Sequence, residues 1–297
     1  MSVQIGINPL TWTNDDMPEL GGETPLEVCL SETAAAGYAG IELGNKFPRV
    51  ASELRPILQA HRLQLISGWY SGELLTRSVA EEKVAVEDHL TLLADMGCSV
   101  MVFAEVSGCI HGAKGTPLSG RPQVADADWA QYGQRLTEVA KYLAGRGVAM
   151  AFHHHMGTAV QSAQDVDRLM ENTGDEVGLL LDTGHLTYAG GDPVAAARAY
   201  APRINHVHCK DMRKDVLARS LDADSGFLDS VLEGVFTVPG DGFIDYPGVF
   251  AALRGASYAG WLVVEAEQDP AIANPLKYAK MGFDYLREKS VAAGLTA

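Results

Sequence analysis

The chain has 297 residues, of which 47% are apolar and 21% charged, a composition typical of globular proteins and not of disordered ones. Its 38 acidic and 23 basic side chains give a formal charge of −15, which argues against nucleic acid and anionic membranes as partners. No uncharged apolar run reaches the ~20 residues of a membrane-spanning helix, and MSVQIGINPLTW at the N-terminus lacks the pattern of a signal peptide.

Short apolar segments alternate along the chain with longer amphipathic ones. The first helix pattern predicts Thr24 as the N-cap and Pro25 as the first helical residue. Eight segments are predicted to be strands: 4–10, 39–44, 63–70, 99–106, 148–155, 177–185, 204–211 and 260–267. The segments between and after them are predicted to be helices: 24–37, 49–61, 78–97, 126–147, 163–172, 193–200, 225–233 and 272–290.

This alternation predicts an α/β fold in which one parallel sheet closes into a (β/α)8 TIM barrel, with residues 1–297 forming a single domain. Several strands are apolar along most of their length, as a sheet covered on both faces requires. A doubly wound open sheet with two domains is the alternative, but no Pro/Gly/Ser-rich linker marks a boundary. The segment 107–127 is rich in Gly and Pro, and we interpret it as a functional loop after the fourth strand.

The four cysteines are far apart in the sequence and form no CxxC pair. They are Cys29, Cys98, Cys109 and Cys209. This spacing favours free thiols in a reducing compartment over a disulfide framework, so we expect a cytoplasmic protein. Cys209 lies among histidines, but its side chain is expected to point away from theirs into the core. Nothing in the sequence decides the oligomeric state, and a homo-oligomer stays open.

Polar residues collect where the predicted strands end. They are Glu42, Trp69, Tyr70, Glu105, His153, His154, His155, Asp182, His185, His206, His208, Lys210, Glu265 and Glu267. In a parallel barrel the carboxyl ends of all strands form one rim, and active sites lie there. Scattered core histidines would not be expected to choose these positions, so the pattern predicts a functional site at the rim.

Imidazoles and carboxylates together are the donors that Mn, Co, Fe or Zn prefer. Side chains alternate along a strand, so His153 shares a face with His155, and His206 shares one with His208. Glu265 directly follows the apolar WLVV, and a carboxylate buried there needs a partner such as a metal ion. The cluster therefore predicts a divalent metal site. For each residue taken alone, a structural hydrogen bond or turn cap is the alternative.

Five residues allow two interpretations each. Trp12, Trp69 and Tyr70 are either barrel packing or the wall of a substrate pocket. His111 and Lys114, on the long loop, are either solvated or part of a lid.

The order of these motifs is similar to that of a known superfamily. His153, then LLLDTGH, then HVHCKD, then VVEAEQD resembles the xylose-isomerase-like TIM barrels. Five other segments resemble the inosose dehydratases of that superfamily: GINPLTWTNDDMPELGGETPLE, SGWYSGELL, AEVSGCIHG, FHHHMGT and VPGDGFID. The resemblance runs over roughly residues 3–290.

The resemblance implies a divalent ion, Mn or Co, held by four residues. They are His153, Asp182, His208 and Glu265. The superfamily has a glutamate where this chain has His153, so His155 and Glu105 remain alternatives for the fourth ligand. Glutathione is a further cofactor that the resemblance alone implies.

The reaction implied is dehydration of scyllo-inosose, a neutral cyclitol ketone, to 3D-trihydroxycyclohexane-1,2-dione in myo-inositol catabolism. It requires a base for the proton beside the ketone and an acid for the departing hydroxide. Four residues are candidates for these roles: His155, His185, Glu105 and Lys210. A metal-dependent ketose epimerase or isomerase on the same barrel is the alternative, and a sugar-binding barrel without catalysis is a third.

Overall fold

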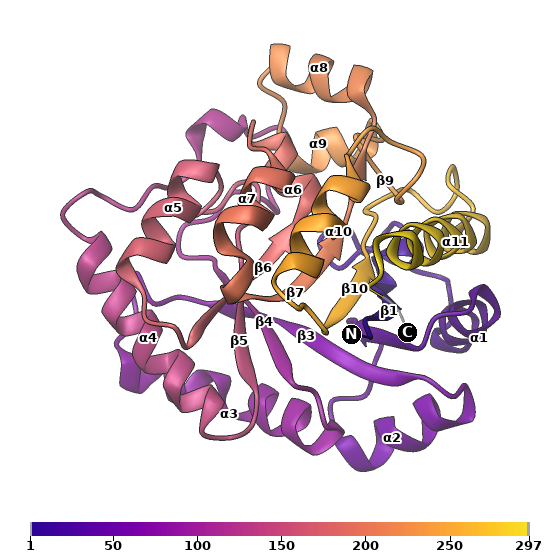
Figure 1. The fold of residues 1–297 in the computed structure, drawn as a ribbon, viewed down its shortest axis with the longest axis horizontal. Helices are drawn as coiled ribbons and strands as arrows, with labels where there is room; N and C mark the ends of the chain where they lie inside the picture. The colour runs from indigo at the N-terminus through magenta and orange to yellow at the C-terminus, as the bar shows by residue number, and fades with distance from the viewer. Residues whose placement is uncertain (1, 296–297) are drawn as a thin grey trace.

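The computed structural model describes residues 2–295. Eight parallel strands close into a barrel in the order β1-β10-β7-β6-β5-β4-β3-β2 (Figure 1). The strands are β1 (Gln4–Ile7), β2 (Gly40–Leu43), β3 (Gln64–Gly72), β4 (Val100–Glu105), β5 (Ala149–His153), β6 (Val177–Asp182), β7 (Ile204–Cys209) and β10 (Trp261–Val264). The predicted TIM barrel is confirmed, and each of its strands lies inside one of the eight predicted segments except β3, which runs two residues further.

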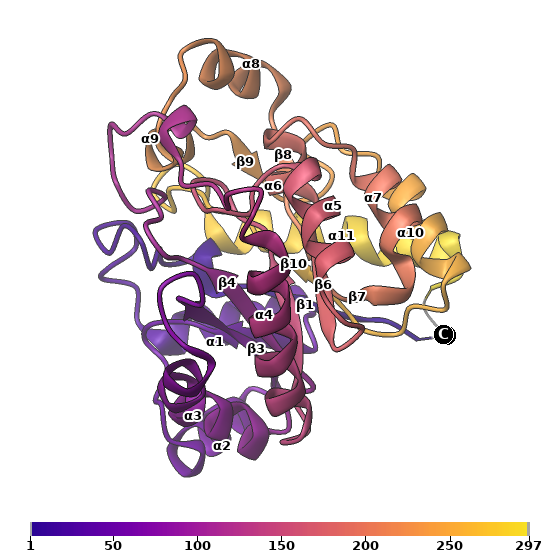
Figure 2. The same cartoon turned by 90° about the vertical axis from the view of Figure 1, so that its left-hand side faces the viewer.

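Helices surround the barrel on its outer side (Figures 1 and 2). The helices are α1 (Leu26–Ala36), α2 (Ala51–Ala60), α3 (Val79–Met96), α4 (Trp129–Ala144), α5 (Ala163–Asn172), α6 (Thr183–Tyr188), α7 (Pro193–Tyr200), α8 (Lys214–Asp222), α9 (Phe227–Leu232), α10 (Tyr246–Gly255) and α11 (Pro275–Ala293). Of these, α8 and α9 lie beyond one end of the barrel and not around it (Figures 1 and 2). Short 3-10 turns occupy Pro9–Thr11, Leu118–Gly120 and Ala201–Arg203. Within residues 2–295 no helix is both long and apolar enough to cross a membrane.

The structure differs from the sequence prediction mainly after β6 and β7. The strand predicted over 177–185 ends at Asp182, because the Asp182 carboxylate accepts from the His185 backbone N–H and so begins α6. Helices α8 and α10 and the two-stranded pair β8 (Asp211–Met212) with β9 (Phe236–Thr237) were not predicted. Helix α1 begins one residue later than predicted: Pro25 is its N-cap and not its first helical residue, and Thr24 is not the N-cap.

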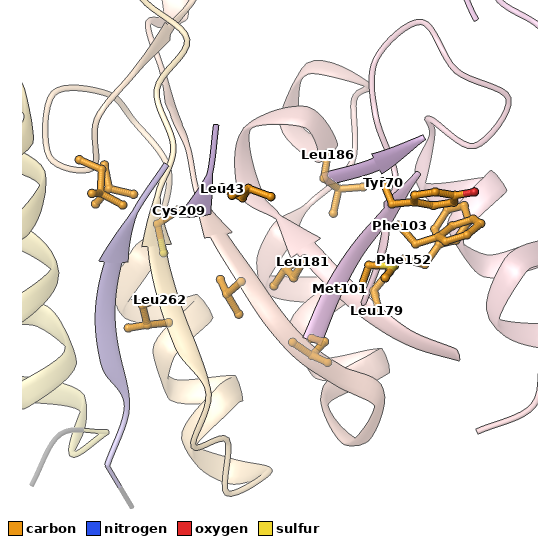
Figure 3. Packing of buried hydrophobic residues seen from close by; sticks show 14 of the residues in the cluster. Leu43, Tyr70, Met101, Phe103, Phe152, Leu179, Leu181, Leu186, Cys209 and Leu262 are labelled. Carbon is orange, nitrogen blue, oxygen red and sulfur yellow. The ribbon is translucent and has the colours of Figure 1, made fainter. Parts of the chain in front are cut away.

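The strands divide their side chains between two cores. Outward-facing residues pack against the helices, among them Met101, Phe103, Phe152, Leu179 and Leu181 (Figure 3). Inward-facing residues form two smaller clusters inside the barrel: Val100, Val102, Ala151 and Leu180 in one, and Ile66, Trp261 and Val263 in the other. Three polar residues continue these inward rows two positions further along their strands: His153, Asp182 and Glu265. The alternation therefore directs them into the mouth of the barrel.

The four cysteines lie apart and form no disulfide among the described residues. Cys29, Cys98 and Cys209 are buried, and Cys209 packs in the outer core, as its position in the strand predicted.

Candidate metal centre and active site

Four predicted metal ligands meet at the carboxyl end of the barrel. His153, Asp182, His208 and Glu265 each offer one ligand atom, and these atoms all lie within 4.8 Å of one another. The strand register contributes, since Asp182 pairs directly with His208 across β6 and β7. All four side chains are buried. This set therefore has the composition and the compactness of a site for a divalent ion.

Three of these side chains are held by their second polar atom. His153 Nδ1 lies 2.7 Å from the backbone oxygen of His154. Asp182 Oδ1 accepts from the backbone N–H of His185 at 2.7 Å. His208 Nε2 lies 3.1 Å from Glu42 Oε1. These bonds fix each side chain so that its other polar atom faces the shared centre.

The atoms that face the centre have no hydrogen-bond partner among the described residues. They are His153 Nε2, Asp182 Oδ2, His208 Nδ1 and Glu265 Oε2, all buried. His208 Nδ1 lies 2.5 Å from Glu265 Oε2, without the alignment of a hydrogen bond. A buried polar atom without a partner costs about 1–3 kcal/mol. A cation bound to all four would remove that cost at once, so the residues present fit a metal ion.

The charges of this group also suit a cation. Burial lowers the pKa of His153 well below its ordinary value, so its imidazole is neutral at pH 7, as metal binding requires. Burial alone would raise the pKa of Glu265, but the His208 and Lys210 charges outweigh it and hold that pKa low. Burial would likewise lower the pKa of His208, but Glu265 and Glu42 raise it well above its ordinary value. The carboxylates around His208 thus favour a positive charge at this centre.

A second group of titratable side chains surrounds Lys210, beside the first. Lys210 Nζ donates to Glu267 Oε1 at 2.5 Å and to His185 Nε2 at 2.9 Å, and it lies 3.6 Å from Glu265 Oε2. The His155 and His185 rings are 3.9 Å apart between centroids. Since Lys210 contacts both Glu267 and Glu265, the two groups form one continuous polar network.

Lys210 is fully buried as a cation. Burial alone would lower its pKa, but the carboxylates of Glu265 and Glu267 outweigh that effect and raise it. Burial raises the pKa of Glu267 to about 7, against the opposing effect of Lys210. Burial lowers the pKa of both His155 and His185 well below the ordinary value. At neutral pH the group therefore offers two neutral imidazoles and one buried ammonium donor.

A cavity of about 280 Å³ opens above both groups. Its lining includes Glu265, Glu267, His155 and His208, and seven further polar residues from the surrounding loops and strands: Asn8, Asp15, Asp16, Glu42, Arg49, Ser71 and His111. Acidic side chains outnumber basic ones in this lining. The cavity therefore suits a small neutral or cationic molecule with several hydrogen-bonding groups.

Trp69 forms one wall of this cavity, one of the two interpretations its sequence position allowed. Its indole N–H donates to Ser71 Oγ at 2.9 Å, and its ring meets the His153 and His155 rings edge-on. Trp12 and Tyr70 are instead buried in the outer core. Trp69 thus presents a fixed aromatic face to a ligand in the cavity.

The two residues of the long loop, His111 and Lys114, also differ in their surroundings. His111 is largely buried and lines the cavity, whereas Lys114 is exposed and forms an ion pair with Glu19.

Glu105, which the sequence offered as an acid or as the fourth ligand, lies apart from both groups and from the cavity lining. It shares the outward face of β4 with Met101 and Phe103, while Val102 faces the cavity. Its carboxylate accepts from the backbone N–H of Ser107 at 3.0 Å, and Oε2 has no partner among the described residues. His155 also stands apart from the four-residue set, since it groups with His185 and Glu267.

Two residues of the site, Glu267 and Glu42, have contacts that their place in the sequence did not predict. Glu267 was noted only as a polar residue at a strand end, yet it holds Lys210. Glu42 was noted in the same way, yet it contacts the imidazole of His208. The spacing of Glu265 and Glu267, two positions apart and so on one face, was the available signal for the first.

Comparison with known proteins places the chain among relatives along nearly its whole length. A sequence model of the family described as "Xylose isomerase-like TIM barrel" matches residues 30–289. The rhizopine catabolism protein MocC of Rhizobium meliloti is 53% identical over 294 residues, which cover 99% of this chain and 90% of that protein. An inosose dehydratase of Geobacillus thermodenitrificans is 44% identical over 288 residues, which cover 96% and 97%.

A solved structure shares the fold at low sequence identity. It is the IOLI protein with a binding zinc atom, which has a TM-score of 0.66 and 16% identity and covers 98% of each chain.

The position of Glu105 predicts how Glu105→Gln behaves. Burial raises the pKa of Glu105 from 4.5 to about 7, so between these values the folded protein holds a proton that the unfolded chain has lost. The wild-type protein therefore loses stability as pH rises through this range, whereas glutamine does not titrate. We expect the variant to be more stable by about 1–3 kcal/mol at pH 8 and by little at pH 4.5.

Urea unfolding at both pH values measures this difference, and elemental analysis measures metal content. A difference that is the same at both pH values would contradict the account of the pKa. Loss of metal from the Glu105→Gln variant would show that Glu105 is a metal ligand.

Proposed function

The chain belongs to the xylose isomerase-like TIM barrel family, and from this we propose that it is a metal-dependent dehydratase acting on scyllo-inosose or a closely similar cyclitol ketone. The observation that carries the proposal is the set of four buried, unpartnered ligand atoms at the barrel mouth, next to a buried Lys210. The 44% identity to an inosose dehydratase over 96% of the chain supports the choice of reaction.

In this proposal His153, Asp182, His208 and Glu265 hold one divalent ion, with Mn or Co as the expected metals. The bound ion would supply Lewis acidity to the ketone oxygen of the substrate and its neighbouring hydroxyl. His153 is preferred as the fourth ligand because its Nε2 belongs to the compact set, whereas His155 contacts His185 instead.

The cavity offers what a neutral polyol requires. Its polar lining provides donors and acceptors for several hydroxyl groups, and Trp69 provides an apolar face for the C–H bonds of a ring. Arg49 is the one arginine of that lining, and Asp15 and Asp16 line it as well. A phosphorylated sugar would meet this acidic surface unfavourably, which agrees with a substrate that has no phosphate.

The chain's own residues divide the proton transfers between them. His155 Nδ1 is held by the backbone oxygen of Met156 at 2.8 Å, which leaves Nε2 to take the proton beside the ketone. The electron pair of that C–H bond forms a carbon–carbon double bond as hydroxide leaves the next carbon. Lys210, acting with Glu267, supplies the proton that converts hydroxide to water. The resulting enol rearranges to the second ketone of the 1,2-dione.

A second candidate follows from the 53% identity to a rhizopine catabolism protein. It is a step in rhizopine breakdown carried out by the same site. Assays with scyllo-inosose and with rhizopine side by side distinguish the two substrates.

Metal removal tests the proposed reaction. Dialysis against EDTA should abolish the conversion of scyllo-inosose, and addition of Mn or Co should restore it, because no other group at the site replaces the cation. The product should be lighter than the substrate by one water, as measured by mass spectrometry. A product of unchanged mass would indicate an epimerase or isomerase, and full activity in metal-free protein would exclude the metal site.

Lys210→Met tests the acid. We expect turnover to fall by about 10²-fold or more, the scale of an acid–base contribution. The melting temperature should fall too, because Lys210 is fully buried and its loss leaves Glu267 without its partner. Glu267→Gln added to Lys210→Met is the matched control: it removes the unpaired charge and should recover most of the stability but none of the turnover. Turnover that recovers together with stability would show that Lys210 has only a structural role.

A further inference from the structure

Beneath the four-residue metal set lies a buried carboxylate that the proposed chemistry does not use. We propose that Glu42 is a positioning residue: it holds the His208 imidazole so that Nδ1 faces the other three ligand atoms. This inference rests on the proposed metal-dependent function and concerns the same site.

Glu42 is the centre of a polar layer inside the barrel. Its Oε1 lies 2.8 Å from His206 Nε2 and 3.1 Å from His208 Nε2, and it accepts from Ser67 Oγ at 2.6 Å. Its Oε2 accepts from Asn8 Nδ2 at 2.7 Å. The carboxylate therefore joins β2, β3 and the residue that follows β1 to β7 across the interior, and it is itself buried. Four donors therefore surround this one carboxylate, of which His206 and His208 come from β7.

The contact with His208 decides which nitrogen of that ring can bind a metal. A carboxylate only accepts, so the bond to Glu42 places a proton on His208 Nε2. The lone pair of the neutral ring is then on Nδ1, the atom that faces Asp182 and Glu265 at 3.7 and 2.5 Å. The same bond fixes the rotation of the ring. Carboxylates that hold metal-binding histidines in this way typically change metal affinity by 10–100-fold when they are removed.

A rival interpretation treats Glu42 as a metal ligand. Glu42, His206 and His208 also offer three ligand atoms within 4.8 Å of one another. Here, however, both Nε2 atoms already lie at hydrogen-bond distance from Glu42, and Asn8 and Ser67 occupy the rest of the carboxylate. The four-residue set instead presents atoms that have no partner among the described residues. The geometry therefore points to Glu42 as a support for the site.

The test measures Co(II) binding directly, without substrate. Glu42→Gln keeps the size of the side chain but removes its charge. We expect it to weaken Co(II) binding by about 10–100-fold in calorimetry. The visible absorption spectrum at saturating Co(II) should also change, because a reoriented His208 alters the coordination of the ion. A purely structural role would lower the melting temperature and leave both the affinity and this spectrum unchanged.

Ser67→Ala is the matched control. It removes one hydrogen bond to the same oxygen of Glu42 but leaves the bond to His208, so Co(II) affinity and spectrum should stay close to those of the wild type. Should Glu42→Gln not fold, Glu42→Asp keeps the charge but withdraws the carboxylate from the imidazole, and the same weakening is expected.

The outcomes separate this inference from the proposed function. Wild-type affinity and spectrum in the Glu42 variant would overturn the positioning role while the metal site stands. A wild-type protein that binds no Co(II) would overturn the proposed function and the positioning role together. Two Co(II) ions per wild-type chain, with one lost in both Glu42→Gln and His206→Gln, would make Glu42 a ligand and overturn the inference.

Discussion

The site depends on one arrangement at the barrel mouth: three of its four buried side chains, those of His153, Asp182 and His208, are held by one polar atom and present the other to a common centre. Asp182 shows how closely this is tied to the fold. One of its oxygens caps α6 and so ends β6, and the other is left facing the histidines. The same residue therefore shapes the backbone and the proposed metal site. A substitution there would alter both.

The parallel barrel makes such a centre possible because it collects residues that are far apart in the sequence. His153 ends β5 and Glu265 directly follows β10, two strands separated by β6 and β7, yet the inward alternation brings both residues to one level. Burying the charged groups of Glu265, Glu267 and Lys210 costs free energy, because all three lie away from water. The polar network around Lys210 offsets part of this cost by placing opposite charges within 4 Å.

The sequence predicted the site best where strands alternate in polarity. In β7 the residues His206 and His208 are separated by Val207 and followed by Cys209, so the sequence alone was enough to predict their shared face. In β4 every residue before Glu105 is apolar, and an all-apolar strand does not reveal which face turns inward. The sequence therefore left open which face of the sheet Glu105 is on. The role of Glu42 depends on contacts across the barrel with β7, and no local pattern encodes those.

The alternation of strand and helix patterns predicted the barrel. It did not predict α6, which begins within the segment 177–185 that was predicted as strand. Its start depends on the hydrogen bond of Asp182 to a backbone N–H three residues later. A sequence pattern does not separate this cap from a ligand, because here the one carboxylate offers an oxygen for each role.

Anomalous diffraction from crystals grown with Co(II) tests the central claim most directly. The account predicts one strong peak, at about 2.0–2.2 Å from His153 Nε2, Asp182 Oδ2, His208 Nδ1 and Glu265 Oε2, the bond lengths that nitrogen and carboxylate ligands make to ions of this kind. A peak between Glu42 and His206, or one more than about 3 Å from His153, would contradict it.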